Sequence, residues 1–159
     1  MTPSLQPEEQ ARVLIDEQLT QAGWHQDIDL VNQYGNAVRE VIMDAGHGRA
    51  DYLLYVDKRA VGVIEAKPSG TTLTGVHWQS AMYAAGLPEA YRATAVLKDD
   101  RLPFIFEASG TETHYTNGFD PNPRTRKIFN FPQPETLARI ARDAEANPDA
   151  PTWRARVHN

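Results

Sequence analysis

The stretch RADYLLYVDKRAVGVIEAKP, residues 49–68, decides the fold of this chain. It holds two short apolar runs, 51–56 and 60–67, and both have the character of β-strands. The link between them, residues 57–59, is short enough for a hairpin. Because the first run is almost continuously apolar, we expect it to be a strand covered on both faces.

Outside this hairpin, apolar residues recur at helical or strand spacing in several further segments. We expect helices at about 7–22, 75–85 and 134–146, strands at 37–43, 94–97 and 103–107, and a loop at 117–134. The resulting order, α-β-β-β-α-β-β-α, predicts an α/β (α+β) domain with a central mixed β-sheet flanked by helices.

Composition narrows the class of protein. A chain of 159 residues with 41% hydrophobic residues suits one globular domain and excludes a coiled coil or a disordered tail. The absence of cysteine excludes disulfides and thiolate chemistry. No apolar run is long enough to span a membrane, and the N-terminus lacks the pattern of a signal peptide, so we expect a cytoplasmic protein with no membrane partner. The net charge of −5 argues against simple electrostatic binding to DNA.

Two acids and a lysine on the predicted hairpin are the candidate site. Glu65 and Lys67 lie two residues apart, so in a strand they share a face. A three-residue turn would place Asp51 opposite Glu65, whereas a two-residue turn would place Asp51 opposite Ala66, on the other face. A shared site therefore requires the longer turn, a bulge or a bend, and the sequence permits each of these.

Carboxylates facing each other favour a bound cation. Asp51, Glu65 and the carbonyl of Ala66 offer the hard oxygen ligands that Mg²⁺ prefers, with Mn²⁺ as a substitute. Lys67 is placed to orient or help deprotonate a water on the metal and to stabilise charge on a phosphate. The alternative is a solvated ion pair at the end of a strand, and spacing alone leaves both interpretations open.

Several ordered segments resemble one known family. Residues 48–56 (GRADYLLYV), 63–68 (VIEAKP), 79–84 (QSAMYA), 102–107 (LPFIFE) and 129–137 (FNFPQPETL) are similar to the N-terminal nuclease domain of type I restriction enzyme R (HsdR) subunits. This domain belongs to the PD-(D/E)xK nuclease superfamily, so the resemblance implies a restriction-endonuclease-like core.

The resemblance also implies roles for individual residues. It makes Asp51 and Glu65 metal ligands and Lys67 the catalytic lysine. Gln79 and Tyr83 match the family's Gln-x-x-x-Tyr signature, which implies a supporting role near the metal or the DNA. Their other interpretation is ordinary: a surface residue and a core aromatic of the helix expected at 75–85.

Two further positions follow from the same comparison. The stretch Glu8-Glu9-Gln10-Ala11-Arg12 resembles the family's Glu-x-x-x-Arg pattern, which implies that Glu8 is an additional metal ligand. The alternative is that Glu8 only complements the positive end of the helix dipole. Ala50 stands where the superfamily usually has a proline.

The implied function is that of a Mg²⁺-dependent endodeoxyribonuclease, the cleavage domain of a type I restriction enzyme. We expect a nuclease domain at 1–146 and a tail or linker toward a motor domain at 147–159. ATP would be used only by motor domains outside this sequence, so we expect the chain to be part of a longer protein or a shortened one. The implied partners are double-stranded DNA and the methyltransferase (M) and specificity (S) subunits.

Two other functions remain open. The domain could be a non-cleaving DNA-docking or subunit-interaction module that retains the nuclease fold, or a stand-alone repair nuclease on the same fold. The basic residues Arg124, Arg126 and Lys127 are candidates for contacts with phosphate, although a solvated loop is the simpler explanation and the one we favour. His47, between two glycines, is interpreted as a turn residue.

Overall fold

The computed structural model describes residues 6–26, 35–42, 49–68, 70, 73 and 86–147. Its elements, in chain order, are α1 (Pro7–Gln21), β1 (Gly35–Ile42), β2 (Arg49–Val56), β3 (Arg59–Ala66), α2 (Glu89–Arg92), β4 (Phe104–Ala108), β5 (Thr113–Asn117), β6 (Arg126–Ile128) and α3 (Pro134–Ala146). Among these residues, no helix is long and apolar enough to cross a membrane.

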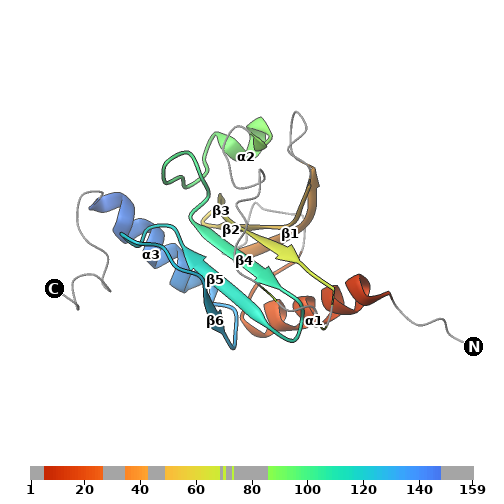
Figure 1. The fold of residues 1–159 in the computed structure, drawn as a ribbon. Helices are drawn as coiled ribbons and strands as arrows, with labels where there is room; N and C mark the ends of the chain where they lie inside the picture. Colours follow the sequence, from red (N-terminus) through yellow and green to blue (C-terminus); the bar gives the residue numbers. More distant parts are fainter. Residues whose placement is uncertain are drawn as a thin grey trace, which may run out of the picture.

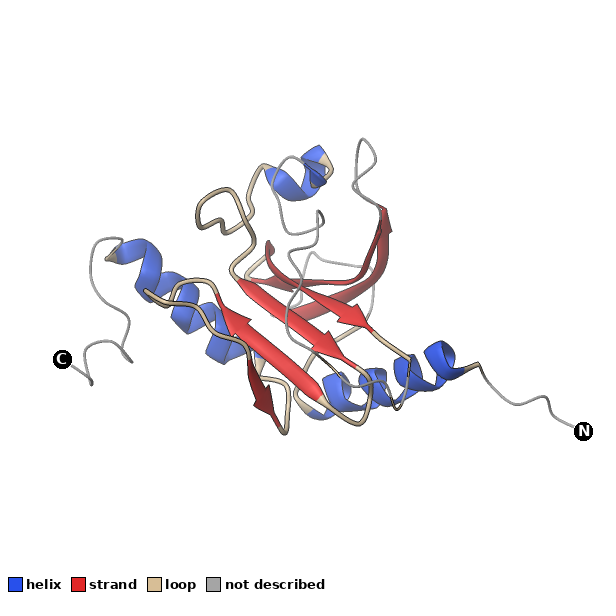
Figure 2. Ribbon diagram, viewed as in Figure 1, coloured by secondary structure: helices blue, strands red, loops and turns tan. Residues whose placement is uncertain are grey.

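The strands form one mixed sheet of six strands in the order β1-β2-β3-β4-β5-β6. All neighbours are antiparallel except β3 and β4, which run parallel. Figure 1 shows α1 and α3 along one side of this sheet and α2 on the other, and Figure 2 shows the same arrangement by type of element. The predicted α/β architecture, a central mixed sheet flanked by helices, is therefore confirmed.

Hydrophobic cores lie on both faces of the sheet, and β2 contributes to each. On one face, Leu54 packs in a cluster with Ile15 of α1 and Leu137 of α3. On the other face, Leu53 packs in a cluster that includes Leu102. Burial on both faces explains why β2 is an almost continuous apolar run rather than an alternating one.

The turn between β2 and β3 contains two residues, not three. Asp57 and Lys58 both have positive φ, at 50° and 64°, as a type I′ turn in a two-residue hairpin loop requires. The register then shifts beside this turn, because Tyr55 pairs with Ala60 but Leu54 pairs with Gly62. The shift is a β-bulge, which changes the facing of every later pair by one residue.

The expected helices at 7–22 and 134–146 and the expected strands at 37–43, 51–56, 60–67 and 103–107 are confirmed within a few residues. The helix expected at 75–85 lies outside the described residues, as do His47 and residues 148–159 of the predicted tail.

The strand expected at 94–97 is wrong. Val96 donates one backbone hydrogen bond to the carbonyl of Ala60, at 2.9 Å, but the segment forms no ladder. It runs instead into a tight turn in which Asp99 and Asp100 have positive φ. The apolar residues of this segment are thus explained by packing against the sheet, since Val96 is buried.

Two strands and one short helix were not expected from the sequence. β6 lies inside the predicted loop 117–134, and β5 is made largely of polar residues, which hid its alternation. Helix α2 begins directly after Pro88, beyond the helix expected at 75–85. These elements complete the sheet edge and one of its covering layers.

Phe131 and Phe129 offer a matched test of the core. Phe131 is 4% exposed, with its ring centre 5.5 Å from that of Phe106, whereas Phe129 is 92% exposed. We expect Phe131→Ala to lower the free energy of unfolding by about 3 kcal/mol, because it leaves a cavity. Phe129→Ala is expected to change it by less than about 0.5 kcal/mol. Urea denaturation measures both, and equal losses would contradict this packing.

Candidate functional site

The predicted trio lies at neighbouring ends of β2 and β3. Asp51 is in β2, Glu65 is the second-last residue of β3, and Lys67 directly follows that strand. Beyond the bulge, Tyr52 pairs with Ile64. Continuing this register by one residue sets Asp51 level with Glu65. With a two-residue turn alone, Asp51 would lie opposite Ala66. The bulge shifts the pairing of β2 with β3 by one residue and so brings Asp51 opposite Glu65. A bulge is one of the three solutions that the sequence left open.

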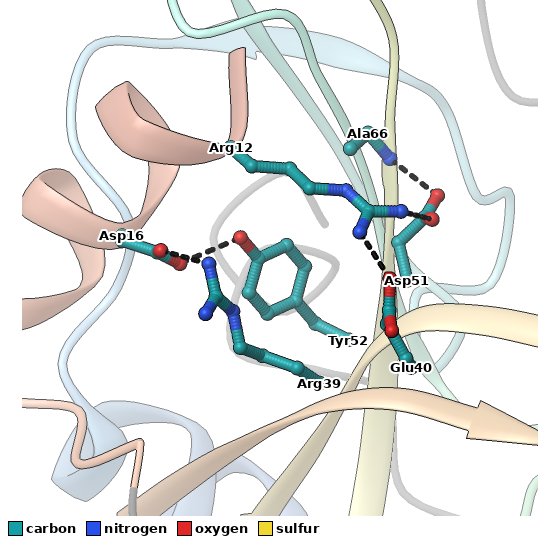
Figure 3. A network of polar contacts seen from close by, with 7 residues as sticks. All are labelled: Arg12, Asp16, Arg39, Glu40, Asp51, Tyr52 and Ala66. Carbon is teal, nitrogen blue, oxygen red and sulfur yellow. Dashed lines mark hydrogen bonds and ion pairs between the residues drawn. The ribbon is translucent and has the colours of Figure 1, made fainter. Parts of the chain in front are cut away.

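The carboxylate of Asp51 is held from two sides (Figure 3). The backbone N–H of Ala66 donates to its Oδ2 at 2.9 Å, and Nη2 of Arg12 donates to its Oδ1 at 2.9 Å. The first contact ties β2 to the end of β3, and the second ties β2 to helix α1. The carboxylate is thus fixed in place between two strands and a helix.

Glu65 and Lys67 form an ion pair beside this carboxylate. Nζ of Lys67 donates to Oε1 of Glu65 at 2.9 Å, and the backbone N–H of Lys67 donates to the carbonyl of Ala108 at 2.8 Å. The pKa of Lys67 is raised, chiefly by this side-chain hydrogen bond and further by the charges of Glu65, Glu107 and Asp51. Lys67 therefore carries its positive charge throughout the neutral range.

Glu107 is a site neighbour that the sequence analysis missed. It lies on β4 level with Glu65 in the parallel register and is only 4% exposed. Its charge contributes to the raised pKa of Lys67. The available signal was an acidic residue within the apolar run of β4, where an unpaired charge is costly and a charged partner is expected.

Arg12 is a second residue that the sequence analysis did not assign to the site. Its Nη1 is bonded to Oε1 of Glu40 on β1 while its Nη2 is bonded to Asp51. The pKa of Arg12 is raised, first by the hydrogen bond to Glu40 and then by the charges of Asp51 and Glu40, against the opposing effect of burial. This guanidinium bridges two carboxylates on adjacent strands.

One turn further along α1, Asp16 makes the reciprocal contact (Figure 3). Its Oδ1 accepts from the hydroxyl of Tyr52 at 2.6 Å, and its Oδ2 accepts from Nη2 of Arg39. The pKa of Tyr52 is raised, first by burial and then by its hydrogen bond to Asp16. Arg12 and Asp16 are four residues apart and so lie on one helix face, which docks α1 onto β1 and β2.

The remaining predicted site residues divide into two groups. Glu8 is exposed in the first turn of α1, where an acid complements the helix dipole. Gln79 and Tyr83 lie outside the described residues. Of the basic residues near β6, Arg126 lies 3.7 Å from Asp120 and Lys127 lies 3.3 Å from Glu112, so both have acidic neighbours.

The donor atoms fit a hard divalent cation by type. Asp51 and Glu65 supply carboxylate oxygens, which are the ligands that such a cation prefers. Oδ1 of Asp51 already pairs with a positive group, the Arg12 guanidinium. Within the described ranges, no group of three or more His, Cys, Asp or Glu side chains is arranged to hold a metal ion. A cation here would thus be held by few protein ligands and keep several waters, as Mg²⁺ commonly does.

Comparisons with known proteins agree on one type of subunit. The family model for the second domain of the type I restriction enzyme EcoKI endonuclease subunit matches residues 24–122, more than half of the 159 residues. This range contains Asp51, Glu65, Lys67 and Glu107. No curated protein matches the chain.

A solved structure shares the fold. It is a fragment described as an HsdR subunit of a type I restriction enzyme from Vibrio vulnificus YJ016, with a TM-score of 0.58 and 19% sequence identity. The similarity covers 92% of this chain but only 27% of that chain, so the present sequence spans about a quarter of the solved one. At this identity the likeness establishes the fold alone.

Proposed function

The chain belongs to the family of the type I restriction enzyme endonuclease subunit second domain, and from this premise we propose that it is the DNA-cleaving module of such a subunit. The proposed reaction is metal-dependent hydrolysis of DNA phosphodiester bonds. The proposed partners of the whole subunit are double-stranded DNA and the methyltransferase and specificity subunits, with ATP used by motor domains outside this sequence.

Family membership and the nuclease assignment are separate statements. The matching model names a second domain, whereas the segments quoted from the sequence resemble the N-terminal nuclease domain of the same subunit. Membership in the subunit family is common to both. The finer assignment, a PD-(D/E)xK nuclease core, rests on the arrangement of Asp51, Glu65 and Lys67.

One observation carries this proposal: the hydrogen bond from the Ala66 N–H to Oδ2 of Asp51, at 2.9 Å. It brings the carboxylate of Asp51 to the residue between Glu65 and Lys67. Two acids and one lysine from two strands thus meet at one place, although 14 residues separate the acids in the sequence (65 − 51). A pair of solvated surface ions needs no such tie between strands.

The chain's own residues have distinct proposed roles. Asp51, Glu65 and the Ala66 carbonyl would hold the metal, which supplies Lewis-acid activation of water and phosphate. Lys67, whose pKa is raised by Glu65, keeps its proton and stabilises negative charge that develops on the phosphate. The raised pKa therefore favours charge stabilisation by Lys67 over proton abstraction. The charge of Glu107 on the neighbouring strand favours this ammonium further.

A second function is favoured by a different observation. Arg12 is already paired with Asp51, and Lys67 is already paired with Glu65, so each candidate carboxylate ligand has a cation beside it. Carboxylates that are paired in this way suit a non-cleaving docking module that retains the nuclease fold. Binding of a divalent cation distinguishes the two functions.

Titration of the chain with Mn²⁺ by calorimetry is the direct test. We expect Mn²⁺ to bind and Asp51→Asn to weaken binding by at least about tenfold, because losing a ligand costs at least as much as losing its supporting contacts. Asp57→Asn is the matched control, since Asp57 lies in the hairpin turn and pairs with Arg142. Binding that Asp57→Asn and Asp51→Asn weaken equally, or no binding at all, would favour the docking module.

A further inference from the structure

Arg12 occupies the Oδ1 side of the Asp51 carboxylate. Its Nη2 lies 2.9 Å from Oδ1, and the two side chains are only 26% and 20% exposed. Partial burial makes this pair stronger than a solvated one, because less water screens the charges. The guanidinium is thus a built-in counter-cation for the candidate ligand (Figure 3).

A divalent cation and this guanidinium compete for the same oxygen. Oδ2 of Asp51 is held by the Ala66 N–H, whereas Oδ1 faces Arg12. A cation bound to Oδ1 would lie within a few ångströms of a fixed positive charge, and at this separation like charges repel strongly in a partly buried site. Binding therefore requires Arg12 to leave Asp51.

Glu40 provides the place to which Arg12 can move. It already accepts a hydrogen bond from Nη1 of the same guanidinium. Glu40 is flanked by the pairs Arg39–Tyr52 and Val41–Ala50, so it lies level with Asp51 on the adjacent strand. Its φ of 53° is uncommon for a residue with a side chain, and such a backbone is a frequent mark of functional positions.

We propose that Arg12 and a divalent cation exchange at Asp51, with Arg12 bridging Asp51 and Glu40 before the cation binds and bonded to Glu40 alone afterwards. This inference rests on the proposed function, because it takes Asp51 as a metal ligand. It makes Arg12 the residue that sets metal affinity. It also gives a role to Arg12, the arginine of the Glu-x-x-x-Arg pattern, whereas the resemblance had implied a role for its glutamate, Glu8.

Arg39 is a natural control for Arg12. Both guanidiniums join α1 to the β1–β2 edge, and both bond to a carboxylate (Figure 3). Arg39 bonds to Asp16 on α1, and no contact joins it to Asp51 among those that the structure describes for these residues. Replacing either arginine by glutamine removes the same charge and weakens the docking of α1, but only the Arg12 replacement frees Asp51.

Calorimetric titration with Mn²⁺ tests the exchange in the unchanged chain and in Arg12→Gln, Arg39→Gln and Asp51→Asn. We expect Arg12→Gln to bind Mn²⁺ about tenfold more tightly, the size of one charge-assisted hydrogen bond. Arg39→Gln is expected to stay within about twofold of the unchanged chain. Thermal unfolding without metal shows whether each variant is folded.

The outcomes separate the two proposals. Equal or weaker Mn²⁺ binding by folded Arg12→Gln, with Asp51→Asn still losing the metal, overturns the exchange and leaves the proposed function standing. Unchanged binding by Asp51→Asn overturns the proposed function itself. A gain shared equally by Arg39→Gln means that net charge is responsible, which also overturns the exchange.

A second measurement needs no variant of Arg12. In the ¹⁵N NMR spectrum of the unchanged chain, Mg²⁺ is expected to shift the guanidinium signals of Arg12 and leave those of Arg39 in place. Asp51→Asn is expected to abolish this response. Arg12 signals that do not move at saturating Mg²⁺ contradict the exchange even if Arg12→Gln fails to fold.

Discussion

Replacing Asp51 by asparagine is expected to slow DNA cleavage at least about 100-fold in the restriction complex that we propose for this chain. Asparagine has the same shape, and its carbonyl oxygen can still accept the hydrogen bond that Ala66 donates to Oδ2. It lacks the negative charge, so it holds neither a divalent cation nor Arg12 as Asp51 does. The experiment follows the conversion of supercoiled circular DNA to nicked and linear forms.

Glu65→Gln and Lys67→Ala are expected to give losses of similar size. Their side chains form one ion pair, so removing either partner breaks the pairing that holds the other in place. Hydrolysis of ATP by the same complex is expected to continue at its usual rate, because we propose that ATP is used by motor domains outside this sequence. Lys58→Ala, in the hairpin turn, is the control for Lys67→Ala and is expected to cleave normally.

Retained cleavage in Asp51→Asn would falsify the nuclease assignment directly. If cleavage and ATP hydrolysis both fall together, the change has damaged assembly of the complex rather than the site. Cleavage that is lost in Asp51→Asn and kept in Lys67→Ala would leave the acid in its role but remove the charge-stabilising role of Lys67. The three substitutions therefore test each residue separately.

The hairpin shows how far the sequence could be taken. Its two apolar runs predicted β2 and β3 within two residues at each end, because strand composition and burial on both faces act locally. The facing of Asp51 and Glu65 was not predictable in the same way. A three-residue turn and a two-residue turn followed by a bulge produce the same facing, and the choice depends on packing around Tyr55 and Ala60.

The contacts of α1 were beyond the sequence for a different reason. Arg12 and Asp51 are 39 residues apart, and nothing in their local patterns indicates that they meet. The Glu-x-x-x-Arg pattern drew attention to its glutamate, Glu8, whereas the residue that reaches the site is its arginine, Arg12. A lone acid in an apolar strand, Glu107, was a readable signal, because such a residue is seldom buried without a charged neighbour.

Gly62→Ala is expected to lower the free energy of unfolding by about 3 kcal/mol. A Cβ at position 62 would lie 2.3 Å from the carbonyl oxygen of Phe104 and 2.9 Å from its Cβ. Phe104 is paired with Gly62 across the parallel β3–β4 contact, so the clash is with backbone that cannot move without separating the strands. Gly118→Ala is a graded control, since its Cβ would lie 3.0 Å from the carbonyl oxygen of Pro103.

Urea denaturation of both variants measures the difference, and we expect Gly118→Ala to lose about 1 kcal/mol or less. The β3–β4 contact also sets Glu65 level with Glu107, and Glu65 lies three residues beyond Gly62 on β3. A strand displaced at Gly62 therefore displaces Glu65 and the ammonium of Lys67 with it. Gly62→Ala is accordingly expected to weaken Mn²⁺ binding even at temperatures where the variant stays folded. Full Mn²⁺ binding by folded Gly62→Ala would mean that β4 does not position the site.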